Sequence, residues 1–193
     1  DRVLAMDLHA AQIPGFFDVP VDHLYAAPVL NEYFLDMHLA PEDIVVVSPD
    51  EGSIKRALGH AERLGGRLAI VDKRRSEDGT AEVMNVVGDV RGRICVLADD
   101  IIDTAGTIQK AAQALKDNGA ARVMASAVHG VLSGPAVQRI EAAPIDRLII
   151  TNTIPLNGGG AECGKIVVLS VARLLAQAIR SIHEETSVSE RFV

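Results

Sequence analysis

Residues 96–107 read VLADDIIDTAGT and join an apolar run to a cluster of acids, small residues and hydroxyls. A helical pattern begins at Ile108, so the stretch is typical of a strand, a tight loop and a helix N-terminus. Such a loop can direct backbone N–H groups and hydroxyls at one phosphate, with the helix dipole behind them. Carboxylates in the same loop suit a sugar phosphate, because they can hold ribose hydroxyls and a metal. The stretch therefore predicts phosphoribosyl chemistry.

Apolar, β-branched runs alternate with helical patterns along the rest of the chain. The runs at 44–47 and 148–150 are continuously apolar, which is typical of strands in a parallel sheet covered on both faces. The alternation predicts an α/β fold with a ligand site at the carboxyl ends of the strands. The expected strands are 2–8, 44–48, 67–72, 82–87, 93–98, 122–128, 146–152 and 165–170. The expected helices are 27–39, 53–64, 107–118, 134–142 and 170–184.

Two polar segments and one glycine predict where elements end. Residues 73–81 have no apolar anchor and predict a mobile polar loop between two strands. Gly158 to Gly160 predict a second flexible loop. Gly119 is well placed as the cap that ends the helix over 107–118.

Composition excludes several function classes. The 193 residues carry a net charge of −7, which argues against non-specific nucleic-acid binding because that requires a basic face. No apolar run is long enough to span a membrane, and no signal peptide is recognisable. Cys95 and Cys163 are isolated and show no zinc spacing, which favours a reducing compartment. We therefore expect a cytoplasmic protein without nucleic-acid or membrane partners.

Three further segments narrow the phosphoribosyl hypothesis. They are MDLHAAQIPGFFDVPVD at 6–22, SPDEG at 48–52 and DKRR at 72–75. In this order, and together with 96–107, they resemble the ribose-phosphate diphosphokinase (phosphoribosyl pyrophosphate synthetase) family. The resemblance covers essentially the whole chain but only the later part of the family's length. Since the chain also begins with Asp1 and runs at once into a strand pattern, we expect it to be a fragment of something longer.

The resemblance implies an architecture. It predicts a type I phosphoribosyltransferase-like parallel sheet flanked by helices, as the second half of a two-domain protein. Residues 1–24 would be the remnant of the first domain, and 25–165 the second domain. Residues 166–193 would form a C-terminal strand, helix and tail that pack back toward the first domain. The family is usually hexameric, so we expect a homo-oligomer.

The resemblance also implies an activity. The family transfers the diphosphoryl group of ATP to the anomeric hydroxyl of ribose 5-phosphate, with Mg²⁺, and forms 5-phosphoribosyl 1-diphosphate and AMP for nucleotide biosynthesis. Its adenine contacts lie largely in the half that this chain lacks. We therefore expect the chain alone to bind ribose 5-phosphate but to turn over poorly.

Site residues carry over position by position. The pyrophosphate loop would be Asp50, Glu51, Gly52 and Ser53, of which Glu51 and Ser53 depart from the small residues common there in the family. The residues implied in ribose 5-phosphate binding are Arg75, Asp99, Asp103, Thr104, Ala105, Gly106 and Thr107.

The catalytic cations would be Lys73 and Arg75. Phosphoryl transfer needs positive charge on the oxygens whose bonds change, and a lid that carries Lys and Arg can supply it while excluding water. Magnesium would be contacted by His9 and Asp50. His9 shares a strand face with Asp7, two residues earlier, and Asp50 follows a buried strand at its carboxyl end.

Two alternatives remain open from the sequence. One is a base-accepting phosphoribosyltransferase, which shares the 99–107 loop. The other is a non-catalytic regulatory or associated subunit that keeps the fold. Lys55 and Arg56 face either a phosphate site or solvent. The histidines outside the motifs are expected on the surface or at helix ends, and they are His23, His38, His60, His129 and His183.

Overall fold

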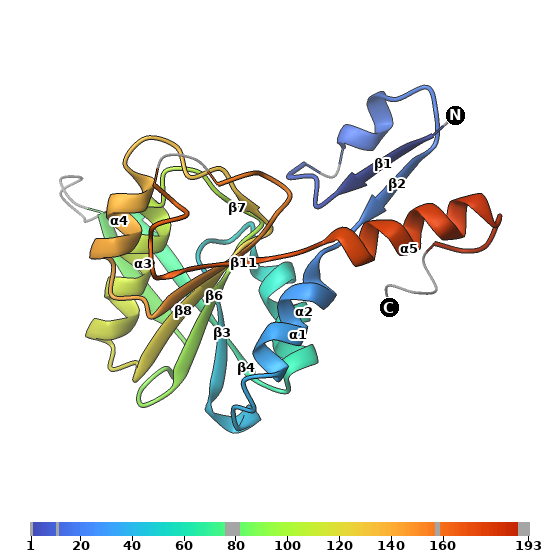
Figure 1. Cartoon of the computed structure of the whole chain (residues 1–193). Helices are drawn as coiled ribbons and strands as arrows, with labels where there is room; N and C mark the ends of the chain where they lie inside the picture. The colour runs from blue at the N-terminus through green and yellow to red at the C-terminus, as the bar shows by residue number, and fades with distance from the viewer. Residues whose placement is uncertain (1, 11, 76–81, 157–158, 189–193) are drawn as a thin grey trace.

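A seven-stranded sheet forms the centre of the molecule in the computed structural model, which describes residues 2–10, 12–75, 82–156 and 159–188 (Figure 1). Its strands are β3 (Ile44–Ser48), β4 (Arg67–Arg75), β5 (Glu82–Val87), β6 (Ile94–Ala98), β8 (Arg122–Ser126), β10 (Arg147–Thr151) and β11 (Ile166–Leu169). Their order in space is β11-β10-β8-β6-β3-β4-β5. Every neighbouring pair is parallel except β4 and β5, so the predicted α/β fold with a parallel sheet is confirmed.

All five predicted helices form. They are α1 (Ala27–Leu35), α2 (Ile54–Leu64), α3 (Gly106–Asp117), α4 (Ala136–Ala142) and α5 (Ala172–His183). The first ends four residues before the predicted end, and His38 beyond it has a φ of +50°, which no helix accommodates. The cap of α3 is Asn118 rather than Gly119. Gly119 follows it with a φ of +88°, the left-handed position that glycine takes after a helix.

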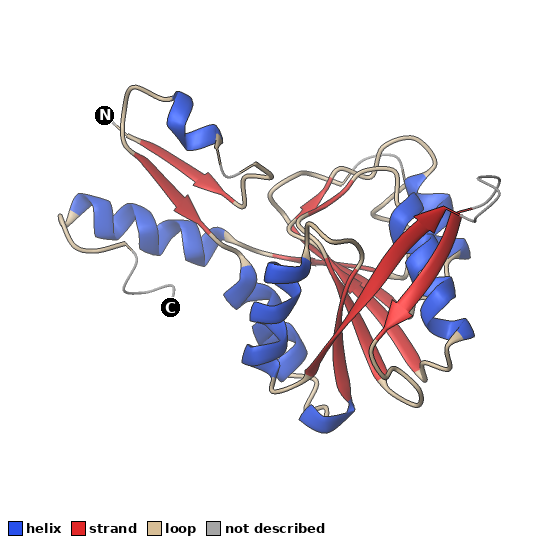
Figure 2. Ribbon diagram, turned by 180° about the vertical axis from the view of Figure 1, so that it is seen from behind, coloured by secondary structure: helices blue, strands red, loops and turns tan. Residues whose placement is uncertain are grey.

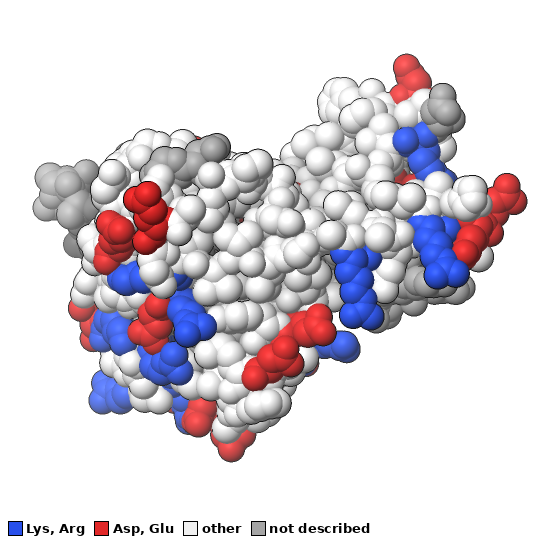
Figure 3. All heavy atoms as spheres, in the orientation of Figure 1, with Lys and Arg blue, Asp and Glu red and all other residues white. Residues whose placement is uncertain are grey.

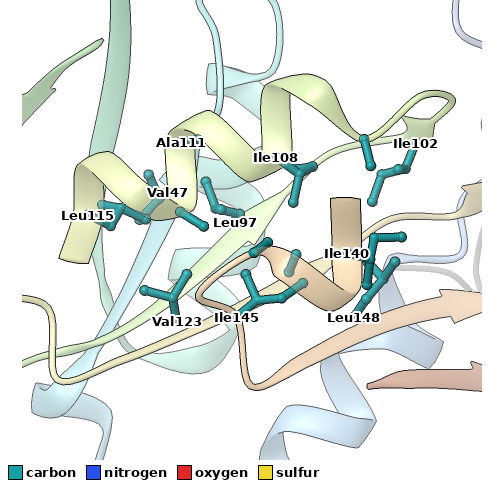
Figure 4. Close-up of a cluster of buried hydrophobic side chains, with 14 of the residues drawn as sticks. Val47, Leu97, Ile102, Ile108, Ala111, Leu115, Val123, Ile140, Ile145 and Leu148 are labelled. Atoms are coloured by element: carbon teal, nitrogen blue, oxygen red, sulfur yellow. The ribbon is translucent and has the colours of Figure 1, made fainter. Parts of the chain in front are cut away.

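The central strands β3, β6, β8 and β10 are buried on both faces, and consecutive residues point to opposite layers. Val45 and Val47 point into the core beneath α3 and α4, drawn in Figure 4, whereas Ile44 and Val46 point into the core beneath α1 and α2. This follows from the two-residue period of a strand. Burying one such side chain contributes roughly 1.5–3 kcal/mol, which explains why these runs are continuously apolar.

A smaller part of the molecule projects away from the sheet (Figures 1 and 2). It contains the parallel pair β1 (Val3–Met6) and β2 (Val21–Leu24), which lie beside α5. The predicted boundaries at residues 24 and 165 stay a prediction. Figure 3 shows acidic and basic side chains interspersed on one face, while the surface between the two parts is mostly uncharged. No helix among the described residues is long and apolar enough to cross a membrane.

Three short strands and two short helices were not predicted. Besides β2, these are β7 (Ile101–Ile102), β9 (His129–Gly130), the 3₁₀-helix η1 (Ile13–Phe16) and the 3₁₀-helix η2 (Pro41–Asp43). Strands β7 and β9 pair with each other. Two-residue strands carry no periodic pattern, so only their pairing across the fold reveals them.

The predicted loop at 73–81 begins too early. Strand β4 continues through Arg75 and pairs antiparallel with β5, with Lys73 opposite Met84 and Arg75 opposite Glu82. Pairing satisfies the backbone of these basic residues whatever the polarity of their side chains. The rest of the predicted loop, 76–81, lies outside the described residues, as does Gly158 of the second predicted loop.

The expectation that His60 is a surface or capping residue is wrong. The His60 side chain is buried between α2 and α1, and its Nδ1 lies 2.6 Å from Oδ1 of Asn31. Burial, aided by the positive charge of Arg56, lowers the pKa of His60 to about 4. Protonation therefore favours the unfolded chain, and the stabilisation present above pH 6.5 is lost as the pH falls from 6.5 to about 4.

We predict that His60 makes folding acid-sensitive. Between pH 7.5 and 4.5 the free energy of unfolding should fall by about 2–3 kcal/mol more in the wild-type chain than in His60→Gln, because glutamine does not titrate. Urea unfolding at both pH values measures this difference. His183→Gln, on an exposed position of α5, should behave as the wild type. Equal falls in wild type and His60→Gln would contradict the prediction.

Candidate functional site

The loop over 99–105 connects β6 to α3 at the carboxyl end of the sheet. Ala105 stands at the N-cap of α3 with a φ of +59°, and no side chain among the described residues caps the helix. The first amides of α3 are therefore available to an anion. The loop and the first turn of α3 line a cavity of about 170 Å³, from Asp99 and Ile101 through Ile108.

Two side chains from the segment after β9 hold this loop. Arg139 Nη1 donates to the carbonyl of Thr104 at 2.9 Å, and the Ser133 hydroxyl donates to the exposed carboxylate of Asp103. Sequence reasoning missed both residues, because they lie about 30 positions from the 99–107 loop and belong to no recognised motif. A second cavity, of about 330 Å³, borders the loop on the side of Arg139 and Lys110.

The predicted pyrophosphate loop meets the 99–107 loop. Asp50 Oδ1 accepts the N–H of Ser53 at 2.9 Å, and the Ser48 hydroxyl donates to the Asp50 carbonyl at 2.6 Å. The Ser53 hydroxyl then donates to Asp99 Oδ1 at 3.2 Å. These contacts bring together two segments that are 46 residues apart in the sequence.

The contact between the loops follows from the sheet topology. Strands β3 and β6 are neighbours, with Val47 opposite Leu97, and the direction of strand order reverses between them. The loops that follow such a pair lead to opposite faces of the sheet and open a crevice, which is where ligands bind in open α/β sheets.

Two neighbouring carboxyls with shifted pKa values, Asp99 and Asp100, follow β6 at this crevice. Burial, a hydrogen bond with Asp100 and the charges of Asp100 and Asp50 raise the pKa of Asp99 well above its usual range. For Asp100, burial acts in the same direction but is outweighed by the His9 hydrogen bond, the Asp99 carboxyl and the Arg56 charge, which lower its pKa. A perturbed carboxyl in a crevice is a candidate for ligand contact.

A chain of charges connects this crevice to the end of β1. Arg56 Nη1 lies 3.2 Å from Asp7 Oδ1, and Arg56 Nη2 lies 3.2 Å from Asp100 Oδ2. Asp100 Oδ2 is also 2.8 Å from Nδ1 of His9, and Asp7 Oδ2 accepts the N–H of Ala26 at 2.6 Å. Arg56, for which the sequence left a phosphate site and solvent both open, faces two acids instead.

His9 and Asp50 are placed differently. The His9 side chain is 75% exposed and tied to Asp100 through Nδ1, whereas the exposed Asp50 is tied to Ser53. Among the described residues, no three His, Cys, Asp or Glu side chains form a group that could hold a metal by themselves. The magnesium contacts of His9 and Asp50 therefore stay a prediction.

Lys73 and Arg75 lie beyond the end of β3. Ile70 pairs with Ser48 as the last residue of that ladder, so Lys73 and Arg75 follow three and five residues past the level of Ser48. At about 3.3 Å per residue, strand β4 carries them roughly 10–16 Å past the sheet edge at which the two loops meet. Their catalytic roles stay a prediction.

Comparison with known proteins identifies relatives of the whole chain. Residues 78–193 match the family model described as the phosphoribosyl synthetase-associated domain. The chain is 54% identical to a ribose-phosphate pyrophosphokinase of Rhodopirellula baltica over 193 residues, all of this chain and 61% of the relative. It is also 54% identical to one of Caldanaerobacter subterraneus, over 99% of this chain and 60% of the relative. The chain thus spans about three fifths of the length of these relatives.

Solved structures agree with the fold. The phosphoribosylpyrophosphate synthetase of Mycobacterium smegmatis matches with a TM-score of 0.86 and 45% identity, over 96% of this chain and 59% of that one. The APRTase of Giardia lamblia matches with a TM-score of 0.52 and 15% identity, over 65% of this chain and 77% of that one, and shows likeness of fold alone.

We predict that Arg56 is the main support of the charge chain. In Arg56→Met the Asp7 and Asp100 carboxylates, whose side chains are 2% and 5% exposed, lose their guanidinium partner. The free energy of unfolding at pH 7 should fall by about 3 kcal/mol, because an uncompensated buried charge is costly. Arg63→Met, on an exposed position of the same helix, should change it by less than about 0.5 kcal/mol. Urea denaturation compares the two, and equal effects would contradict the role of Arg56.

Proposed function

The chain belongs to the phosphoribosyl synthetase-associated domain family, and from this premise we propose that it carries the ribose 5-phosphate part of a ribose-phosphate pyrophosphokinase active site. In the proposed reaction the anomeric hydroxyl of ribose 5-phosphate attacks the β-phosphorus of ATP, and AMP leaves. The observation that carries the proposal is the hydrogen-bonded contact between the 99–107 loop and the 50–53 loop at the reversal of strand order. A base-accepting phosphoribosyltransferase shares the 99–107 loop but leaves the 7–9 and 73–75 segments without a role.

The 99–107 loop would hold ribose 5-phosphate. The amides and hydroxyls of Thr104 to Thr107 would bind the 5-phosphate, supported by the absence of a side-chain cap on α3 among the described residues. Asp99 and Asp103 would accept hydrogen bonds from the ribose hydroxyls. Asp99 is among the residues that line the cavity at this loop.

The 50–53 loop and His9 would serve the diphosphoryl group and its Mg²⁺. An exposed carboxylate such as Asp50 suits a hard cation, and Mg²⁺ in enzymes of phosphoryl transfer is usually held by one or two carboxylates, waters and substrate phosphates. A site with few protein ligands therefore fits the residues present. When bound, Mg²⁺ would neutralise charge that develops on the phosphate oxygens.

Lys73 and Arg75 would supply positive charge during transfer. Both residues lie on β4 beyond its last pair with β3, on the side of the sheet from which the two loops emerge, which supports this role. Charge brought onto the transferring group stabilises the transition state more than the substrates. We propose further that the protein is a cytoplasmic homo-oligomer whose substrates are ATP and ribose 5-phosphate.

Phosphorus NMR tests the proposed reaction. The chain with ATP, ribose 5-phosphate and Mg²⁺ should form AMP and 5-phosphoribosyl 1-diphosphate in equal amounts. The rate should be low, because the resemblance places most adenine contacts outside this chain. Omission of ribose 5-phosphate is the control and should abolish AMP formation. Release of pyrophosphate from 5-phosphoribosyl 1-diphosphate on addition of a nucleobase would support a phosphoribosyltransferase instead and sink the proposal.

We predict that Asp103→Ala weakens the binding of ribose 5-phosphate about 10- to 100-fold, since a hydrogen bond to a charged group contributes roughly 1.5–3 kcal/mol. Isothermal titration calorimetry of the chain measures the dissociation constant. Asp117→Ala removes an exposed carboxylate at the far end of α3 and should leave it unchanged. An unaltered dissociation constant in Asp103→Ala would remove Asp103 from the site.

A further inference from the structure

We propose that Ser53 is a positioning residue for the sugar: its hydroxyl orients the Asp99 carboxylate so that the carboxylate can accept the ribose hydroxyls. The inference rests on the proposed function and extends it to a residue of the other loop. Ser53 is buried, with 8% of its surface exposed.

The hydroxyl of Ser53 is diverted from its usual task. Ser53 is the N-cap of α2, with φ −92° and ψ 1°. A serine at this position normally accepts a hydrogen bond from an amide in the first turn, which stabilises a helix by about 1 kcal/mol. Ser53 makes no such bond, and its Oγ donates to Asp99 Oδ1 at 3.2 Å instead. The Ser53 hydroxyl thus contributes to the crevice and does not cap α2.

Two donors meet on one oxygen of Asp99. Oδ1 accepts the Ser53 hydroxyl at 3.2 Å and the N–H of Asp100 at 2.9 Å. Two directions of hydrogen bonding on one oxygen fix the plane of a carboxylate. Asp99 also lines the cavity formed by the 101–108 segment, so the orientation of its carboxyl bears on what that cavity can bind.

A neutral donor suits this position electrically. Asp99 lies among the carboxyls of Asp50 and Asp100, and burial also disfavours its ionised form. A hydroxyl that donates to a carboxylate favours the accepting form, which is the form that can bind ribose hydroxyls. A lysine in place of Ser53 would favour the ionised form of Asp99 more strongly. It would also form an ion pair with the carboxylate and compete with the sugar for it.

Ser53 contacts the two loops through different atoms, so the two contacts can be removed separately. Its backbone N–H bonds to Asp50 and its side-chain hydroxyl bonds to Asp99. Replacement by alanine or glycine removes only the second contact. Replacement by threonine keeps both. The effects on the sugar and on the pyrophosphate loop can therefore be told apart.

Calorimetric titration of the chain with ribose 5-phosphate, and separately with inorganic phosphate, tests this role. Ser53→Ala and Ser53→Gly should weaken ribose 5-phosphate binding about three- to tenfold, which is the range of one net hydrogen bond. Phosphate binding should be unchanged, because the proposed 5-phosphate site at 104–107 does not use the Asp99 carboxylate. Ser53→Thr should bind both as the wild type does. Backbone amide spectra of the variants establish that each is folded.

A double-mutant cycle with Asp99→Asn decides whether Ser53 acts through Asp99. In the Asp99→Asn background, Ser53→Ala should cause little further loss, since the carboxylate it would orient is gone. Full additivity of the two losses, or an equal loss of phosphate binding in Ser53→Ala, would overturn the inference while the proposed function stands. A wild-type chain that binds no ribose 5-phosphate would overturn both.

Discussion

The parallel ladder between β3 and β6 is the constraint on which the rest of the site depends. With Val47 opposite Leu97, both strands end at the same level, and the loops that follow begin within hydrogen-bonding reach of each other. Reversal of strand order at this pair sends α2 and α3 to opposite faces of the sheet. The crevice is therefore a consequence of strand order, and the loops that follow β3 and β6 supply the polar residues that line it.

Acidic side chains gather around the crevice, and the fold stabilises their carboxylates in two ways. Asp7 and Asp100 are bridged by Arg56, a cation supplied by the helix that follows the 50–53 loop. Asp99 Oδ1 instead accepts hydrogen bonds from two neutral donors, the Ser53 hydroxyl and the Asp100 N–H. A carboxyl supported by neutral groups stays open to a ligand, whereas one paired with arginine is committed to structure. Asp99, the proposed ligand contact, thus differs in its support from Asp7 and Asp100.

Local pattern predicted the regular elements well because their causes are local. Strand 44–48 and the five helices follow from apolar period and helix-end residues. The predictions failed where contact with a distant part of the chain decided the structure. Lys73 belongs to β4 because β5 pairs with it, and His60 is buried because α1 presents Asn31 to it. Neither partner is adjacent in sequence, so neither could be seen in a window of residues.

The sequence by itself determined the α/β class, the sheet-forming runs and the 99–107 and 50–53 loops, since each depends on residues close together in the chain. Only the tertiary structure decided what those loops touch. The contacts from Ser53 to Asp99, from Arg56 to Asp100 and from Ser133 to Asp103 join residues 30 to 46 positions apart. Their pairing depends on strand order and on the direction of each helix, which no local pattern encodes.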